Sequence, residues 1–177
     1  MTVKTDACMP DIEFTHQVVP NPPPATPSQS RAEDEQALLQ RAFAILDRRY
    51  ASGEGITSPA AAADLFKGRL GGCEQEVFAV LFLDNHHRVL AYEEMFFGTI
   101  DGAEVHPREV VKRALALNAA AVILGHGHPS GSPEPSAADR AVTAQLKQAL
   151  ALVDVRLLDH FVVGNGPPVS LAMRGWV

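Results

Sequence analysis

The sequence predicts a three-layer α/β (α+β) domain in which helices flank a mixed β-sheet. Two continuous apolar runs, over residues 76–83 and 119–125, are typical of strands buried on both faces of a sheet. Segments with apolar residues at helical spacing alternate with these strands. Turn-forming residues at 84–87 separate the first run from a further strand over 88–97, and this pattern predicts an antiparallel hairpin. Interspersed helices and strands with one hairpin among them indicate a mixed sheet.

The first 29 residues differ from the rest of the chain in their proline content. Six of the 13 prolines lie between Pro10 and Pro27. Each proline fixes its own φ and restricts the residue before it, so neither a helix nor a strand ladder continues through this stretch. We therefore expect residues 1–29 to form a flexible or polyproline-like arm. Apolar residues within it leave open an arm that packs on the domain.

A helical lead-in is expected over residues 30–72. Apolar residues at helical spacing predict an amphipathic helix over about 31–50. Ser58 followed by Pro59 is typical of an N-cap and a first helical residue. The second helix is expected to run from there to about residue 70, where two glycines interrupt the chain.

The remaining residues, 73–177, are expected to form the main domain. After the hairpin, the glycines at 98 and 102 mark a short strand or a loop. The chain then predicts a helix, a strand, a long loop, a second helix and two more strands. The expected ranges are 106–118 for the helix, 119–125 for the strand, 126–135 for the loop, 136–152 for the second helix and 155–163 for the next strand, with a turn at 164–168 before the last one.

Composition excludes several classes of protein. The formal net charge of −6 disfavours a general binder of nucleic-acid backbones, which needs a basic face. The two cysteines, Cys8 and Cys73, build neither a disulfide framework nor a cysteine zinc site. The N-terminus does not resemble a signal peptide, and no apolar stretch is long enough for a membrane-spanning helix. We therefore expect a cytoplasmic protein without a membrane partner.

The residues that carry chemistry lie where the strand over 119–125 ends. His126 and His128 are two residues apart, so their side chains face the same side of an extended chain. Asp139 lies in the first turn of the next helix, and the proline- and glycine-rich loop between them allows that turn to come back to the strand. Two imidazoles and one carboxylate suit Zn²⁺, and three protein ligands leave a fourth position for water, as in catalytic sites.

Water bound at such a site needs a general base. The candidates in the sequence are Glu74, Glu76, Glu93 and Glu94. Glu76 begins the first buried strand, where a carboxylate is costly unless it faces a polar cavity or an ion. Position alone, however, does not separate Glu76 from Glu74.

A simpler interpretation exists for the same residues. A pair of histidines two apart occurs by chance in many chains. Ser136 and Asp139 also have the spacing of a capping box, in which the serine caps the helix and the acid accepts from the serine amide. The two interpretations compete for the Asp139 carboxylate. Ser136 caps the helix in either case, or offers its hydroxyl to an oxyanion beside the metal.

The string H-x-H-P-S-G followed by P-S-x-x-D resembles the motif of the JAMM (MPN+) metalloproteases. Further segments resemble the RadC family of bacterial JAMM proteins, and the resemblance covers about residues 34–175. Those segments are E-V-F at 76–78, F-G-T at 97–99, V-H-P-R-E-V at 105–110, N-A-A-A at 118–121 and L-D-H at 158–160. Residues 1–29 show no sign of the helix-hairpin-helix segment of longer RadC proteins.

The resemblance implies a cytidine-deaminase-like JAMM/MPN fold and hydrolysis of a peptide or isopeptide bond by zinc-activated water. It assigns His126, His128 and Asp139 as zinc ligands, Glu76 as the general base and Ser136 as the residue that assists the tetrahedral intermediate. RadC proteins usually carry an asparagine between the two histidines, whereas this chain carries Gly127. A glycine there is expected to loosen the backbone between the ligands.

Two functions follow as hypotheses. The first is a zinc hydrolase that acts on a peptide or protein substrate. The second is a JAMM-like scaffold, weakly active or inactive, that binds protein or DNA in a mobile-element or DNA-repair context; Gly127 motivates it. His160 and Asp159 are expected to be hydrogen-bonded core residues, with a supporting role for the zinc ligands as the alternative. Nothing in the sequence specifies an oligomeric state.

Overall fold

The computed structural model describes residues 34–35, 37–38, 41–42, 44–45, 55–56, 58–98 and 104–177. The arm predicted over 1–29 lies outside these residues. Of the helix predicted over 31–50, the described residues are helical. The chain divides into two units, Met1–Gln36 and Ala37–Val177, and the sheet and its helices belong to the second.

The centre of the second unit is a five-stranded mixed sheet with the order β2-β1-β3-β4-β5. β1 runs antiparallel to both β2 and β3, β3 runs parallel to β4, and β4 runs antiparallel to β5. The mixed sheet and its hairpin are therefore confirmed. The strands are β1 (Val77–Leu83), β2 (Val89–Phe97), β3 (Ala121–Gly127), β4 (Arg156–Val163) and β5 (Val169–Ser170).

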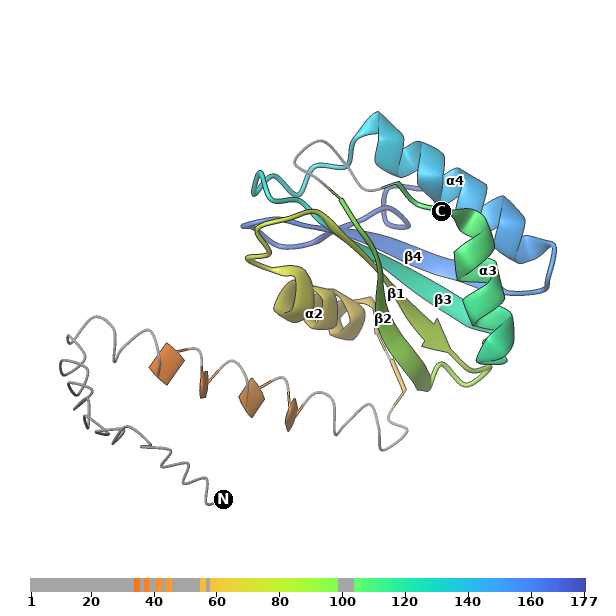
Figure 1. The fold of residues 1–177 in the computed structure, drawn as a ribbon, viewed down its shortest axis with the longest axis horizontal. Helices are drawn as coiled ribbons and strands as arrows, with labels where there is room; N and C mark the ends of the chain where they lie inside the picture. Colours follow the sequence, from red (N-terminus) through yellow and green to blue (C-terminus); the bar gives the residue numbers. More distant parts are fainter. Residues whose placement is uncertain are drawn as a thin grey trace, which may run out of the picture. The chain divides into compact units, whose positions relative to one another are not determined.

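Helices cover both faces of the sheet, which gives the predicted three layers (Figure 1). α2 (Pro59–Leu70) packs on one face, and α3 (Pro107–Ala116) and α4 (Ala137–Ala151) pack on the other. Alternate residues of β1 supply the two cores, because successive side chains of a strand point to opposite faces. Ala79, Leu81 and Leu83 pack under α2. Phe78, Val80 and Phe82 pack under α3 and α4.

The helix boundaries agree with the local signals. Ser58 caps α2 by accepting a hydrogen bond from the amide of Ala61 at 3.2 Å, and Pro59 is the first helical residue. α2 lies in the lead-in predicted over 30–72, yet its buried residues share a core with β1 and β3. The helix and the sheet therefore form one folded body.

One boundary near the histidines differs from the prediction. The strand expected over 119–125 is β3, which continues to Gly127. The reason is pairing on both sides, since Gly127 lies opposite Val77 of β1 and Val163 of β4. His126 is therefore part of the sheet and not of the following loop.

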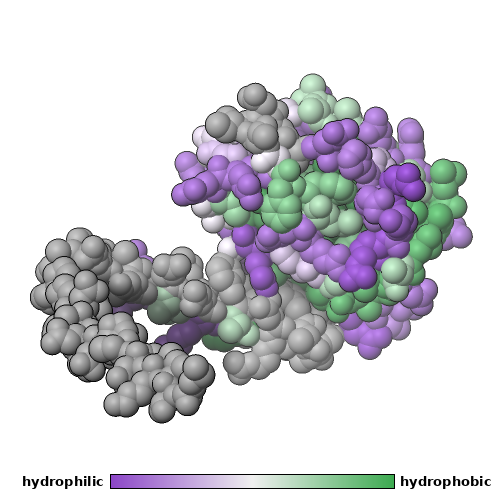
Figure 2. All heavy atoms as spheres, viewed as in Figure 1, coloured by the Kyte–Doolittle hydropathy of each residue, from purple (hydrophilic) through white to green (hydrophobic). Residues whose placement is uncertain are grey.

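The described residues contain no helix that is long and apolar enough to cross a membrane. Figure 2 shows hydrophobic residues in separate patches among hydrophilic ones on the visible face. The segment 99–103, in which a short strand or a loop was expected, lies outside the described residues.

Candidate metal centre

The end of β3 aims two imidazoles at one side of the sheet. His126 is buried in the strand, and His128 follows directly after it. The amide of His128 donates to the carbonyl of Val163 at 2.8 Å, so the ladder with β4 holds this backbone too. Gly127 faces the opposite side, where a Cβ would lie 3.3 Å from Cβ of Leu70. The glycine between the histidines thus belongs to a strand that is paired on both sides, and the expectation that it loosens the backbone stays a prediction.

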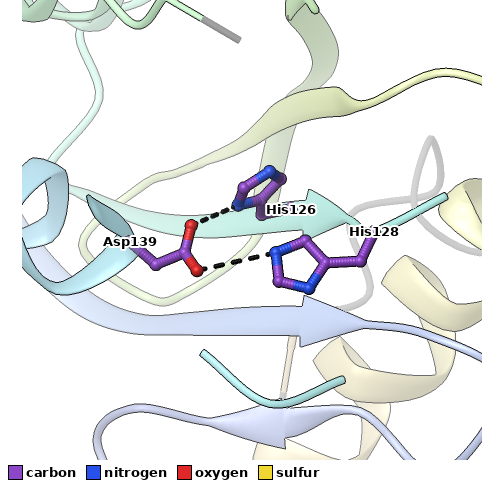
Figure 3. Close-up of side chains that lie close together, drawn as sticks. All are labelled: His126, His128 and Asp139. Carbon is purple, nitrogen blue, oxygen red and sulfur yellow. Dashed lines mark ion pairs between the residues drawn. The ribbon is translucent and has the colours of Figure 1, made fainter. Parts of the chain in front are cut away.

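Asp139 brings a carboxylate to the same place from the first turn of α4 (Figure 3). Its Oδ1 lies 2.7 Å from Nδ1 of His126, and its Oδ2 lies 3.5 Å from Nε2 of His128. One ligand atom from each of the three residues can be chosen so that all lie within 4.8 Å of one another. His128 and Asp139 are 11 residues apart in the sequence, and the loop between them therefore brings their side chains together.

The capping box and the histidine contacts exist together. Oδ2 of Asp139 accepts from the amide of Ser136 at 2.6 Å and from its hydroxyl at 2.7 Å, while the hydroxyl accepts from the amide of Asp139 at 3.1 Å. Oδ1 remains directed at His126. The two interpretations of Asp139 therefore hold together, because Oδ1 faces His126 while Oδ2 accepts from Ser136 and also lies 3.5 Å from Nε2 of His128.

Glu76 is the glutamate that reaches the histidines. The antiparallel register pairs Phe78 with His126, which places Glu76 just before β1 and beside the end of β3. Its Oε1 lies 2.5 Å from Nε2 of His126. Position in the sequence could not separate Glu76 from Glu74, whose side chain is exposed.

The other two candidate bases are occupied elsewhere. Glu93 accepts from Arg113 of α3, with one N–O distance of 2.7 Å. Glu94 is exposed and accepts from the hydroxyl of Tyr92 at 3.3 Å. The structure therefore brings Glu76 to the site and leaves both of these glutamates away from it.

The electrostatics of the site favour a bound cation. His126 has a carboxylate oxygen at each ring nitrogen, Asp139 at Nδ1 and Glu76 at Nε2. A neutral imidazole carries one donor and one acceptor, whereas an ionised carboxylate only accepts. With a neutral ring, one of the two contacts therefore brings a lone pair of the imidazole against a lone pair of a carboxylate. A positive charge, on the ring or on a bound ion, removes this repulsion. Nδ1 of His126 is also buried without an aligned hydrogen bond, despite its 2.7 Å distance to Asp139. The residues fit a metal ion.

The pKa shifts of Asp139 and His128 point the same way. Burial alone would raise the pKa of Asp139, but His126, His128 and Ser136 outweigh burial and hold that pKa far below its usual range. The pKa of His128 is raised, first by its interaction with Asp139, against the lowering effect of burial. Asp139 is thus an anion, as a ligand must be, and His128 binds a proton readily when no metal competes for it.

His128 is oriented by its second nitrogen. Nδ1 lies 2.8 Å from the carbonyl oxygen of Ser132, to which it donates when it carries the ring proton. That tautomer leaves Nε2, the nitrogen nearer Asp139, as a lone-pair donor. Metal-bound histidines usually have a partner of this kind on the other nitrogen. The arrangement prepares His128 for coordination.

Two further residues support the site, and the sequence analysis missed one of them. The hydroxyl of Thr143 donates to the carbonyl of Asp139 at 2.5 Å and lies 2.7 Å from Nδ1 of His160. The His160 ring stacks on His126, with centroids 6.2 Å apart, and burial lowers the pKa of His160 to about 3. A neutral His160 is both a core residue and a neighbour of the ligands. Thr143 carried no sequence signal, because its role depends on helix packing.

Asp159 has a different part in the structure. Its carboxylate accepts from the amides of His160 at 2.7 Å and Ala172 at 2.9 Å, and from the hydroxyl of Ser170 at 2.6 Å. It therefore ties β4 to the C-terminal segment. The expectation of a hydrogen-bonded core residue fits these contacts.

A cleft of about 490 Å³ opens over the site. The candidate ligands and Glu76 lie in its wall, together with Ser136. The rest of the wall is formed by Phe78, Val105, Pro129, Ser130, Ala138, Ala141, Val142 and Gln145. All five residues that the sequence singled out therefore line one cleft.

Comparison with known families decides the relationship. Residues 56–176 match the family described as the RadC-like JAB domain. The chain belongs to the RadC-like JAB (JAMM/MPN) family. The match includes α2, every strand of the sheet and the candidate metal centre.

Relatives in Xanthomonas and Xylella support the assignment. The RadC-like chain is 60% identical over 141 residues to a UPF0758 protein of Xanthomonas oryzae pv. oryzae (strain PXO99A), which covers 80% of this chain and 63% of that protein. It is 63% identical over 148 residues to a UPF0758 protein of Xylella fastidiosa (strain 9a5c), which covers 84% of this chain and 66% of that protein. The RadC-like chain thus spans a little under two thirds of the length of these relatives.

Proposed function

We propose that this RadC-like protein is a zinc-dependent hydrolase of peptide or isopeptide bonds. The observation that carries the proposal is the setting of His126, which lies between two carboxylates in an open cleft with His128 beside it. A bound cation would satisfy both contacts, and two imidazoles with one carboxylate form a ligand set typical of catalytic zinc. His126, His128 and Asp139 would hold the ion.

When bound, zinc supplies Lewis-acid polarisation of a carbonyl and lowers the pKa of water. Glu76 supplies the base. Its carboxylate reaches the edge of the ligand set from β1, at 2.5 Å from His126, so it is placed to take a proton from the attacking water. The same carboxyl then passes the proton to the leaving nitrogen, which departs as a neutral amine.

Ser136 lies in the cleft wall, at the start of α4. Its hydroxyl donates to Oδ2 of Asp139 at 2.7 Å. Once Asp139 binds a cation, its oxygens need this donor less, and the hydroxyl can turn its proton toward an oxyanion that forms on the substrate carbonyl. The amide of Ser136 continues to hold Asp139 in place.

The test compares two neighbouring glutamates. Wild type, Glu76→Gln and Glu74→Gln are purified without metal, titrated with Zn²⁺ and assayed on internally quenched peptide and isopeptide libraries. We expect one zinc per chain in all three proteins. Turnover should fall by about 10²–10⁴-fold in Glu76→Gln and stay unchanged in Glu74→Gln, because only Glu76 reaches the site. Zinc binding by a wild type that cleaves neither library would reject the proposal.

A further inference from the structure

One side of the cleft is an apolar groove that runs along α4 away from the ligands. Ala138, Ala141, Val142 and Gln145 of α4 all line the cleft. Their spacing of three, four and seven residues places them on one face of the helix. Val105 lines the same cleft from the segment before α3. We call the surface formed by these five residues the α4 groove.

The α4 groove is open and uncharged. Ala138, Ala141 and Gln145 are exposed, while Val142 and Val105 are half-buried. Among the described residues that line the cleft there is no lysine or arginine, and the only carboxylates are Glu76 and Asp139 of the site itself. A charged substrate side chain that packed against the groove would lose water without gaining a partner.

The length of the α4 groove sets how much of a substrate it can hold. At about 1.5 Å of rise per residue, the seven helical steps from Ala138 to Gln145 span about 10 Å. An extended peptide advances about 3.3 Å per residue, so the groove accommodates about three substrate residues. The small side chains of Ala138 and Ala141 leave room beside the helix, and Gln145 offers an amide at the far end.

We propose that the α4 groove is the specificity subsite of the enzyme and binds about three uncharged, aliphatic residues on one side of the scissile bond. This inference rests on the proposed hydrolase function, since it names the substrate class of the same site. The occupant is a peptide segment because the groove is continuous with the ligands in a single cleft. Aliphatic side chains would pack against Val105 and Val142, and the Gln145 amide can bond to the peptide backbone.

The first test varies the substrate. Zinc-loaded protein is given peptides that are identical except for Val, Leu, Asp or Lys at each position within three residues of the cleaved bond. On one side of that bond, we expect kcat/KM to be at least about tenfold higher for Val and Leu than for Asp. Equal cleavage of the Val and Asp peptides on both sides would overturn the inference.

The second test varies the groove with matched charges. Val142→Glu and Gln145→Glu each add a carboxylate to the α4 groove, whereas Ala144→Glu adds one to the same helix outside the cleft. The two groove variants should lower the ratio of kcat/KM for Val to that for Lys by at least about tenfold. Zinc stoichiometry should stay unchanged, and Ala144→Glu should behave as wild type. Because Gln145 is exposed, its variant tests the groove even if Val142→Glu fails to fold.

Two outcomes can be distinguished: that the protein does not hydrolyse peptides, and that the α4 groove does not bind aliphatic residues. If the zinc-loaded wild type cleaves no peptide, the proposed function is rejected, and the groove is then judged by binding alone. Acetylated tetrapeptides that differ only in Val or Asp are titrated while the methyl NMR signals of Val105 and Val142 are followed. Larger shifts with the Val peptide support the α4 groove, and equal or absent shifts overturn it.

Discussion

The α2 face of the sheet and the face covered by α3 and α4 are supplied by alternate residues of the same strands. Each face buries polar groups, but their surroundings differ. On the α2 side of β4, both carboxylate oxygens of Asp159 accept hydrogen bonds from other groups of the chain. On the opposite side, His126 lies between two acceptors and its Nδ1 lacks an aligned hydrogen bond.

The difference between Asp159 and His126 indicates which of the two sites would bind a ligand from outside the chain. A buried polar group without a partner costs about 1–3 kcal/mol, so a ligand that satisfies such a group is favoured by that amount. Asp159 needs nothing beyond the chain, and it serves structure. His126 lies between two carboxylates in the wall of a cleft, where a bound cation would satisfy both contacts. The contacts alone thus distinguish the structural carboxylate of Asp159 from the candidate metal centre.

The largest effect is expected when the metal site loses its anion. Asp139→Asn removes the negative charge from the ligand set and leaves only one acceptor oxygen, so zinc affinity should fall by more than about 100-fold. Asp159→Asn is the matched change on the other side of β4, and it should leave zinc affinity unchanged while lowering the free energy of unfolding by about 1–3 kcal/mol. Zinc titration with a chromophoric competitor measures the first effect, and urea denaturation measures the second. Equal zinc affinity in the two variants would remove the basis of the comparison.

Acidity provides the next test of the same site. The pKa of His128 is raised from the ordinary value of 6.5, mainly by Asp139, so a proton competes with zinc at higher pH than at an unperturbed histidine. As the pH falls below that pKa, zinc affinity should decrease by about tenfold per pH unit for this one proton. His160, whose pKa is lowered to about 3, should add nothing between pH 5 and pH 8.

The pH dependence of folding stability in the metal-free protein has the opposite sign to the pH dependence of zinc affinity. A raised folded-state pKa means that the contact of His128 with Asp139 contributes stability below the unfolded pKa, and this stability is lost as pH rises through the folded pKa. The contribution of His128 should therefore favour the metal-free fold at low pH and the zinc-loaded fold at high pH. Melting temperatures with and without Zn²⁺ across that pH range check this. A zinc affinity that is constant from pH 8 to pH 5 would contradict the assignment of His128 as a ligand.

The structural features that were predicted correctly from the sequence are those that depend on local signals. The Ser58 cap, the apolar runs and the hairpin turn were recognised because each is written in a few neighbouring residues. Position alone left the choice between Glu76 and Glu74 open, and only the family resemblance selected Glu76, because the choice depends on the register between β1 and β3, which joins residues 50 positions apart. The end of β3 was placed too early for the same reason, since pairing with β1 and β4 extends it through His126.

A third prediction concerns the α2 face. Gly125 lies opposite α2, and a Cβ at that position would come within 2.0 Å of the Phe66 ring. Gly125→Ala should therefore force the helix or the strand to move and lower the free energy of unfolding by about 3 kcal/mol. Zinc stoichiometry of the folded fraction should stay at one, because the side chain points away from the metal site. A melting temperature equal to that of wild type would show that α2 packs less tightly than its contacts indicate.

The smallest effect is expected two residues further along the same strand. At Gly127 a Cβ would meet Cβ of Leu70 at 3.3 Å and its carbonyl oxygen at 3.4 Å, which a shift of a few tenths of an ångström relieves. Gly127→Ala also restricts the unfolded chain, which favours folding by about 0.4–1 kcal/mol and offsets the crowding. The net change in the free energy of unfolding should stay below about 1 kcal/mol, with zinc affinity within about twofold of wild type. A large loss of zinc affinity in Gly127→Ala, measured by the same competitor titration, would mean that the backbone between the histidines needs glycine. Retained affinity would mean that the paired strand alone fixes their geometry.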